Sequence, residues 1–154
     1  MENWKTDLKE HFMEQKATKK EIEEKKKLKE KAGKRFIKKE VLPAFEEIEK
    51  ELKKYRREAQ VDSKKDWAAL AVKKGKKKEF VYEINVSEEG DKVLASKSVY
   101  TPNKKGKLKL GVEGKISNPE NSLALTNINK ENIIDDFLAE YMEATRIKFT
   151  AAAG

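Results

Sequence analysis

The segment EFVYEINV, from Glu79 to Val86, decides the class of fold because two kinds of side chain alternate along it. Large apolar side chains take every second position, and polar or smaller ones stand between them: Phe80, Tyr82, Ile84 and Val86 against Glu79, Val81, Glu83 and Asn85. Successive side chains of a strand point to opposite faces of its sheet. The segment therefore predicts a strand that buries one face.

The same period of two extends over residues 66–116 and divides into four strands. The other three are expected near residues 67–72, 93–100 and 107–112, with turns around Gly75, Gly90 and Gly106. Turns this short join antiparallel neighbours, so the order predicts a meander. The pattern leaves the inward face of the third strand undecided. Residues 117–125 are loop-like, with room for a short fifth strand.

The stretch before the sheet has helical periodicity. Five apolar side chains recur at spacings of four and three residues: Val41, Phe45, Ile48, Leu52 and Tyr55. This spacing predicts a helix over residues 36–59 that lies on a sheet. Pro43 interrupts it, and a proline costs about 3 kcal/mol inside a helix and disfavours the α conformation for Leu42. Either Pro43 begins a new helix or one long helix kinks there.

A further helix is expected over residues 130–148, after an N-cap at Asn129. It presents a broad apolar face, formed by Ile133, Ile134, Phe137, Leu138, Tyr141 and Met142. Residues 150–154 are expected to be a disordered tail. Together the elements predict an α+β fold. A long N-terminal helix, kinked or straight, precedes a four- to five-stranded antiparallel meander, and a C-terminal helix packs on one face of the sheet. The α+β domain is expected to span residues 36–149.

Residues 1–35 are expected to form a charged helical extension of this domain. Trp4, Leu8 and Phe12 recur every four residues and make a short apolar stripe near its start. Between residues 14 and 34 apolar residues become sparse among glutamates and lysines, so this part buries little. Because a charged spacer separates the stripe from the core, we expect the stripe to contact a partner.

Composition excludes several classes of function. The chain has 154 residues, 36 of them basic and 28 acidic, with a net charge of +8, one histidine and no cysteine. It therefore has no disulfides, no thiol nucleophile and no site that needs two histidines within one chain. Since no catalytic constellation stands out, we expect a protein that is not an enzyme and holds no metal or cofactor. No apolar run is long enough to span a membrane, and no secretory leader is evident, so a cytoplasmic location is expected. The richness in lysine and glutamate is also typical of thermophiles.

One cluster of charge follows from the meander itself. Alternate turns of a meander lie at the same end of the sheet, so the first and third turns should be about 10 Å apart. These turns carry eight lysines, here called the lysine pole: Lys73, Lys74, Lys76, Lys77, Lys78, Lys104, Lys105 and Lys107. Such a pole suits a polyanion. Against this, neither turn has an arginine or an aromatic residue, and lysines also protect sheet edges from aggregation.

These observations lead to three hypotheses. The leading one is a non-enzymatic module that acts through protein–protein contacts or self-association by the N-terminal helix, with Trp4, Leu8 and Phe12 as contacts. The second is binding of nucleic acid or another polyanion through the lysine pole. The third is a ligand-binding cup, since a curved sheet covered by helices can enclose a pocket.

Overall fold

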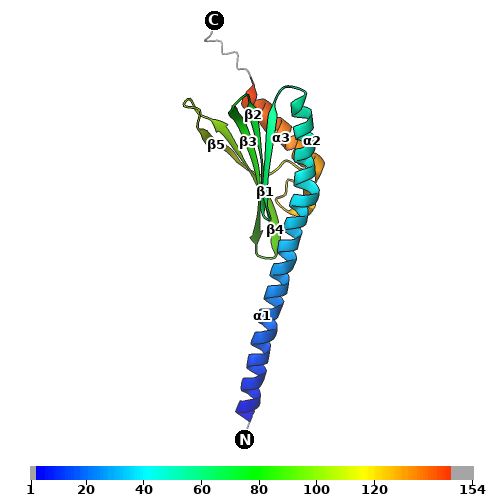
Figure 1. The fold of residues 1–154 in the computed structure, drawn as a ribbon. Helices are drawn as coiled ribbons and strands as arrows, with labels where there is room; N and C mark the ends of the chain where they lie inside the picture. The colour runs from blue at the N-terminus through cyan, green and yellow to red at the C-terminus, as the bar shows by residue number, and fades with distance from the viewer. Residues whose placement is uncertain (1–2, 147–154) are drawn as a thin grey trace.

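The computed structural model describes residues 3–146 and confirms the predicted α+β fold (Figure 1). The helical first part comprises α1 (Asn3–Phe36), the π-helical turn η1 (Ile37–Val41) and α2 (Leu42–Lys53). The strands that follow are β1 (Glu58–Lys64), β2 (Trp67–Lys74), β3 (Lys77–Glu89), β4 (Lys92–Pro102) and β5 (Leu108–Gly114). The 3-10 turn η2 (Leu125–Asn127) leads to the last helix, α3 (Lys130–Thr145).

Pro43 lies within one unbroken helical run from Asn3 to Lys53. The turn before it widens, and the Leu42 amide donates to the carbonyl of Ile37, five residues back. In a regular α-helix the proline ring would clash with the carbonyl of Lys39, so the π turn is a physical means of accommodating it. Leu42 keeps α-helical angles, and the expectation that Pro43 would disfavour them is wrong.

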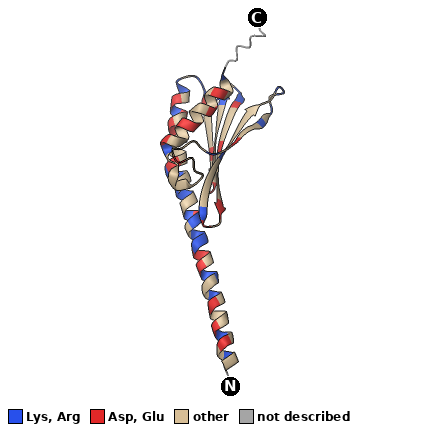
Figure 2. Cartoon of the chain, turned by 180° about the vertical axis from the view of Figure 1, so that it is seen from behind, with Lys and Arg blue, Asp and Glu red and all other residues tan. Residues whose placement is uncertain are grey.

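The first part of α1 projects away from the rest of the molecule. Every residue from 3 to 28 is exposed, a length of about 40 Å at 1.5 Å per residue. Figure 2 shows basic and acidic residues interspersed along this segment. Packing against the rest of the same chain therefore does not stabilise this part of the helix.

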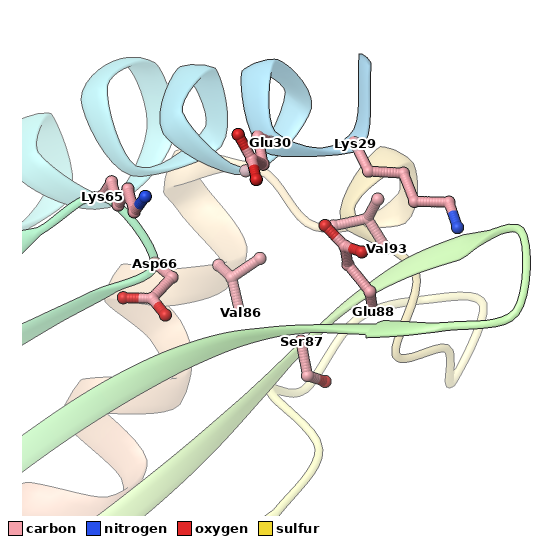
Figure 3. Close-up of a pocket in the computed structure, with 9 residues that line it drawn as sticks. Lys29, Glu30, Lys65, Asp66, Val86, Ser87, Glu88 and Val93 are labelled. Atoms are coloured by element: carbon pink, nitrogen blue, oxygen red, sulfur yellow. The ribbon is translucent and has the colours of Figure 1, made fainter. Parts of the chain in front are cut away.

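Contact with the sheet begins near the end of α1. The Lys29 ammonium donates to the carbonyl of Gly90 in the β3–β4 turn. Gly33 is buried, and a Cβ atom there would lie 3.2 Å from Cγ1 of Val86 on β3. Figure 3 shows Val86 pointing toward the helix beside a hollow of about 350 Å³. The predicted end of the extension at residue 35 thus falls where α1 already contacts the sheet.

The sheet is a meander in which all neighbours are antiparallel, in the order β1-β2-β3-β4-β5. The face of the third predicted strand, undecided from sequence, is now clear: Ala95, Lys97 and Val99 of β4 point toward the helices and are buried. Of the alternate residues on the opposite face, Ser96 and Tyr100 are half-buried, whereas Ser98 is buried.

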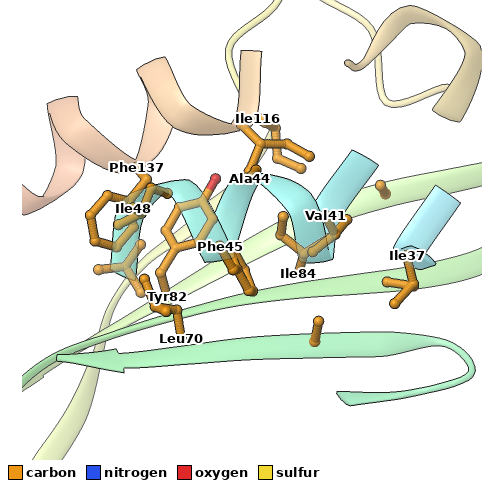
Figure 4. Close-up of a cluster of buried hydrophobic side chains, with 14 of the residues drawn as sticks. Ile37, Val41, Ala44, Phe45, Ile48, Leu70, Tyr82, Ile84, Ile116 and Phe137 are labelled. Atoms are coloured by element: carbon orange, nitrogen blue, oxygen red, sulfur yellow. The ribbon is translucent and has the colours of Figure 1, made fainter. Parts of the chain in front are cut away.

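The core fills the space between this sheet and α2 and α3 (Figure 4). Phe45 of α2 and Phe137 of α3 both meet the ring of Tyr82 edge-on, at centroid distances of 6.1 and 5.5 Å. Phe80 adds a third edge-on contact with Phe137, at 5.4 Å. All four rings are fully buried. The alternation in Glu79–Val86 thus does supply the buried face of the central strand.

Two predicted helix ends and the predicted place of a fifth strand are wrong. The helix expected over residues 36–59 ends at Lys53, because Arg56 takes left-handed angles (φ 60°) and strand β1 begins at Glu58. The fifth strand is therefore β1, whereas residues 117–125 contribute only an isolated bridge between Leu94 and Ala124. Helix α3 ends at Thr145, earlier than expected. The predicted tail at 150–154 lies outside the described residues.

A leucine-to-alanine substitution should lower the free energy of unfolding much more in the core than in the projecting part of α1. Leu70→Ala removes a fully buried side chain and should lower the free energy of unfolding by about 2–5 kcal/mol. Leu28→Ala changes a side chain that is 65% exposed and should lower it by less than about 0.5 kcal/mol. Urea unfolding followed by circular dichroism measures both, and equal losses would contradict this arrangement.

Candidate functional site

The apolar stripe lies on the projecting part of α1, where Trp4, Leu8 and Phe12 are 63%, 48% and 58% exposed. Helical geometry relates this stripe to the sheet: Ile22 lies about five whole turns after Trp4, and Gly33 about eight. The stripe therefore continues the face of α1 that β3 covers at Gly33. Between its apolar ends a shallow hollow is lined by His11, Gln15, Thr18 and Ile22, among others.

The β2–β3 and β4–β5 turns, which carry the lysine pole, lie at the same end of the sheet. They share a hollow of about 720 Å³ lined by Lys74, Lys76, Lys77, Lys78 and Lys105. The side chain of Asn103 shapes the second turn, because its oxygen accepts from the amides of Lys105 and Lys107 at 2.9 and 3.0 Å. Within the described chain, none of the eight lysines forms an ion pair.

Strand β1, which the sequence did not reveal, brings a third basic segment to this end. Glu58 pairs with Lys73 in the sheet, so the loop just before it, with Tyr55, Arg56 and Arg57, adjoins the β2–β3 turn. Arg57 Nε donates to Glu79 at 3.0 Å. The loop that adjoins the β2–β3 turn therefore contains the arginines and the tyrosine that neither lysine turn contains.

Glu79 links this loop to α3. Its carboxylate also accepts a hydrogen bond from the hydroxyl of Tyr141. Partial burial, and then the hydrogen bond to Glu79, raise the pKa of Tyr141 to about 12, so the phenol stays a donor. The Glu79 charge is thus already bound by Arg57 and Tyr141.

A buried charged cluster joins α3 to the sheet, and sequence analysis did not find it. Lys97 Nζ lies 2.7 Å from Asp136 Oδ1 and 3.0 Å from Glu140 Oε1. The other oxygen of Asp136 accepts from the Tyr82 hydroxyl at 2.6 Å, and Oδ1 also accepts from the amide of Ser117 at 3.0 Å. Burial first, and Asp136 second, raise the pKa of Tyr82 well above its usual value. The alternation of β4 offered one signal, because it places Lys97 between Ala95 and Val99.

Every buried side-chain polar atom of this cluster has a partner, which is typical of a structural site. Among the described residues, no buried side-chain nitrogen or oxygen lacks a hydrogen bond. Asp136 is 2% exposed and Lys97 is 5% exposed, and the cluster lines none of the hollows beside α1, at the lysine pole or between α2 and α3. We therefore assign it to positioning α3 on β3 and β4.

An apolar hollow of about 330 Å³ lies between α2 and α3, with Leu52, Tyr55, Ile134, Leu138 and Met142 in its lining. Tyr55 and Met142 are 69% and 61% exposed. The hollow adjoins the basic end, since its lining also includes Tyr141, the partner of Glu79.

Comparisons with known proteins give no information on the function of these surfaces. No family model, no curated protein and no solved structure matches the chain. In the described part of the chain, no helix is both long enough and apolar enough to cross a membrane.

In the buried cluster, the contribution of Lys97 to the free energy of unfolding should depend strongly on Asp136, and that of Asp136 on Lys97. Lys97→Met leaves Asp136 buried without its cation and should lower the free energy of unfolding by about 3–5 kcal/mol. Asp136→Leu alone should cost a similar amount. The double variant should cost markedly less than the two single losses added together, because no unpaired charge remains between Lys97 and Asp136. Additive losses in a double-mutant cycle would show that the pair is not coupled.

Proposed function

We propose that the protein is a self-associating module in which the projecting part of α1 pairs with the same segment of a second copy. One observation carries the proposal. Four large apolar side chains on one face of residues 3–28 are 48% to 63% exposed: Trp4, Leu8, Phe12 and Ile22. Helices in proteins draw most of their stability from packing, and fully burying one such side chain contributes about 1.5–3 kcal/mol.

The position of the stripe favours an antiparallel pair. The stripe faces the same side as Gly33, where the β3–β4 hairpin packs on α1. In a parallel pair, both hairpins would have to occupy the space between the helices. In an antiparallel pair, they lie at opposite ends, and each exposed segment matches the length of its partner by two-fold symmetry. Polar residues at the centre of the seam, such as Gln15, then help to set the register.

The helix-covered face of the sheet is filled by the core. Nothing in the described residues therefore favours the ligand-binding cup over self-association. The protein is proposed to act without catalysis, as a partner-binding module.

Charge placed on the seam should prevent association. Leu8→Glu and Ile22→Glu should each weaken the dimer at least tenfold, because an ionised carboxylate would have to be buried. Met13→Glu is the matched control, since it points about half a turn away from Trp4 and Leu8 and should leave the dimer intact. Light scattering across a concentration series measures the mass. A full-length protein that stays monomeric at high concentration would refute the proposal.

Single cysteines can determine the orientation, because the chain has no cysteine of its own. In an antiparallel pair centred near Gln15, Gln15→Cys lies opposite its own copy and should form a disulfide-linked dimer under oxidation. His11→Cys should not, since its copy lies about eight residues, or about 12 Å, further along the axis. Disulfide formation by both variants would instead indicate a parallel pair.

A further inference from the structure

We propose that the basic end of the sheet binds single-stranded nucleic acid, with the lysine pole on the phosphates and Tyr55 and Arg56 as added contacts. This surface lies at the end of the sheet opposite to the projecting part of α1 (Figure 1). The proposal is independent of self-association through α1. It follows from charge, from backbone conformation and from the position of one exposed ring.

The positive charge around the lysine hollow has little compensating negative charge in its lining. The hollow at the lysine pole has one carboxylate in its lining, Glu79, and that group is bound by Arg57 and Tyr141. Protection of a sheet edge does not explain the first turn, because Lys74, Lys76 and Lys77 connect β2 and β3, which are inner strands. Five lysines around one hollow suit the closely spaced phosphates of a nucleic-acid strand.

Arg56 occupies a backbone position where glycine is favoured. The amide of Arg57 donates to Leu52 and that of Arg56 donates to Lys53, both at 3.1 Å, which is the paired pattern that ends a helix in a Schellman motif. That motif needs a left-handed residue, and Arg56 has a φ of 60°. Its side chain is exposed and forms no ion pair or hydrogen bond within residues 3–146. An arginine in a strained position without a structural contact points to a ligand.

Tyr55 supplies the aromatic surface that the lysine turns lack. Its side chain is 69% exposed, while its carbonyl accepts from Arg57 Nη1 at 3.2 Å. Arg57 in turn contacts Glu79 in the lining of the lysine hollow, so the backbone of Tyr55 adjoins the basic surface, while Tyr55 also lines the apolar hollow between α2 and α3. Unpaired bases stack on exposed aromatic rings, whereas a duplex hides the faces of its bases. The ring therefore favours a single strand.

Binding can be measured by fluorescence anisotropy, with the full-length protein and a labelled twelve-nucleotide oligothymidine. The logarithm of the affinity should fall with the logarithm of salt at a slope of about −2 to −4, for three to five phosphates neutralised. Lys76→Glu with Lys105→Glu should weaken binding at least tenfold. Lys65→Glu with Lys92→Glu makes the same change of charge at exposed sites on the opposite end and should alter affinity less than twofold. An affinity independent of salt, or an equal loss in both double variants, would overturn the proposal.

The variant Arg56→Gly distinguishes a role of the Arg56 side chain in ligand binding from a role in the stability of the fold. Glycine suits the left-handed position, so the melting temperature should stay the same or rise, while affinity for the oligonucleotide falls about threefold or more. A lower melting temperature with unchanged affinity would show that Arg56 serves the fold and would contradict its assigned role.

Tyr55→Ala tests the choice of a single strand. It should weaken binding of oligothymidine at least fivefold and leave binding of a twelve-base-pair duplex within twofold of the original protein. Wild-type protein should also prefer the single strand. An equal or greater affinity for the duplex would overturn the assignment to single strands and leave a general polyanion site.

Discussion

The packing of Phe45, Tyr82 and Phe137 joins α2, the sheet and α3, and the rest of the molecule depends on it. Tyr82 meets both phenylalanines edge-on, and its hydroxyl reaches Asp136 on α3. One side chain of the central strand thus contributes to the apolar core and also to the buried charged cluster. Because α2 is held here, α1 has a fixed direction in which to project. Because α3 is held here, Tyr141 reaches Glu79 of β3 beside the basic end.

Two departures from regular helix geometry determine where the surfaces lie. The π turn before Pro43 lets the helix continue, so the apolar stripe of α1 extends well beyond the sheet. At the other end, the left-handed Arg56 stops α2 and turns the chain into β1. A helix continuing to residue 59 would have carried Arg56 and Arg57 away from the lysine turns. The same conformation that ends the helix therefore assembles the basic end.

The two proposed surfaces lie at opposite ends of the molecule, and this has a consequence for an antiparallel pair. Such a pair would place a basic end at each extremity of an elongated particle. Two sites linked in this way can engage one strand together, which raises the apparent affinity without any new contact. The mixed charges on α1 suit a solvated connection between them, as Figure 2 illustrates.

The sequence by itself determined the class of fold, because periodicity is a local property. Alternation in Glu79–Val86 and the spacing of Val41 to Leu52 predicted a helix-covered meander and most of its core, and the meander also indicated that two lysine turns share one end. Only the tertiary structure decided the rest. Strand β1 has a weak pattern of its own, since just Ala59 and Val61 are half-buried, and pairing with β2 defines it. Lys97 and Asp136 reveal their partnership only when α3 lies on β4, because ion pairs distant in sequence leave no periodic trace. The position of Arg56 and Tyr55 beside the lysine turns could not be predicted either, because the direction of the chain after a helix depends on packing between distant segments.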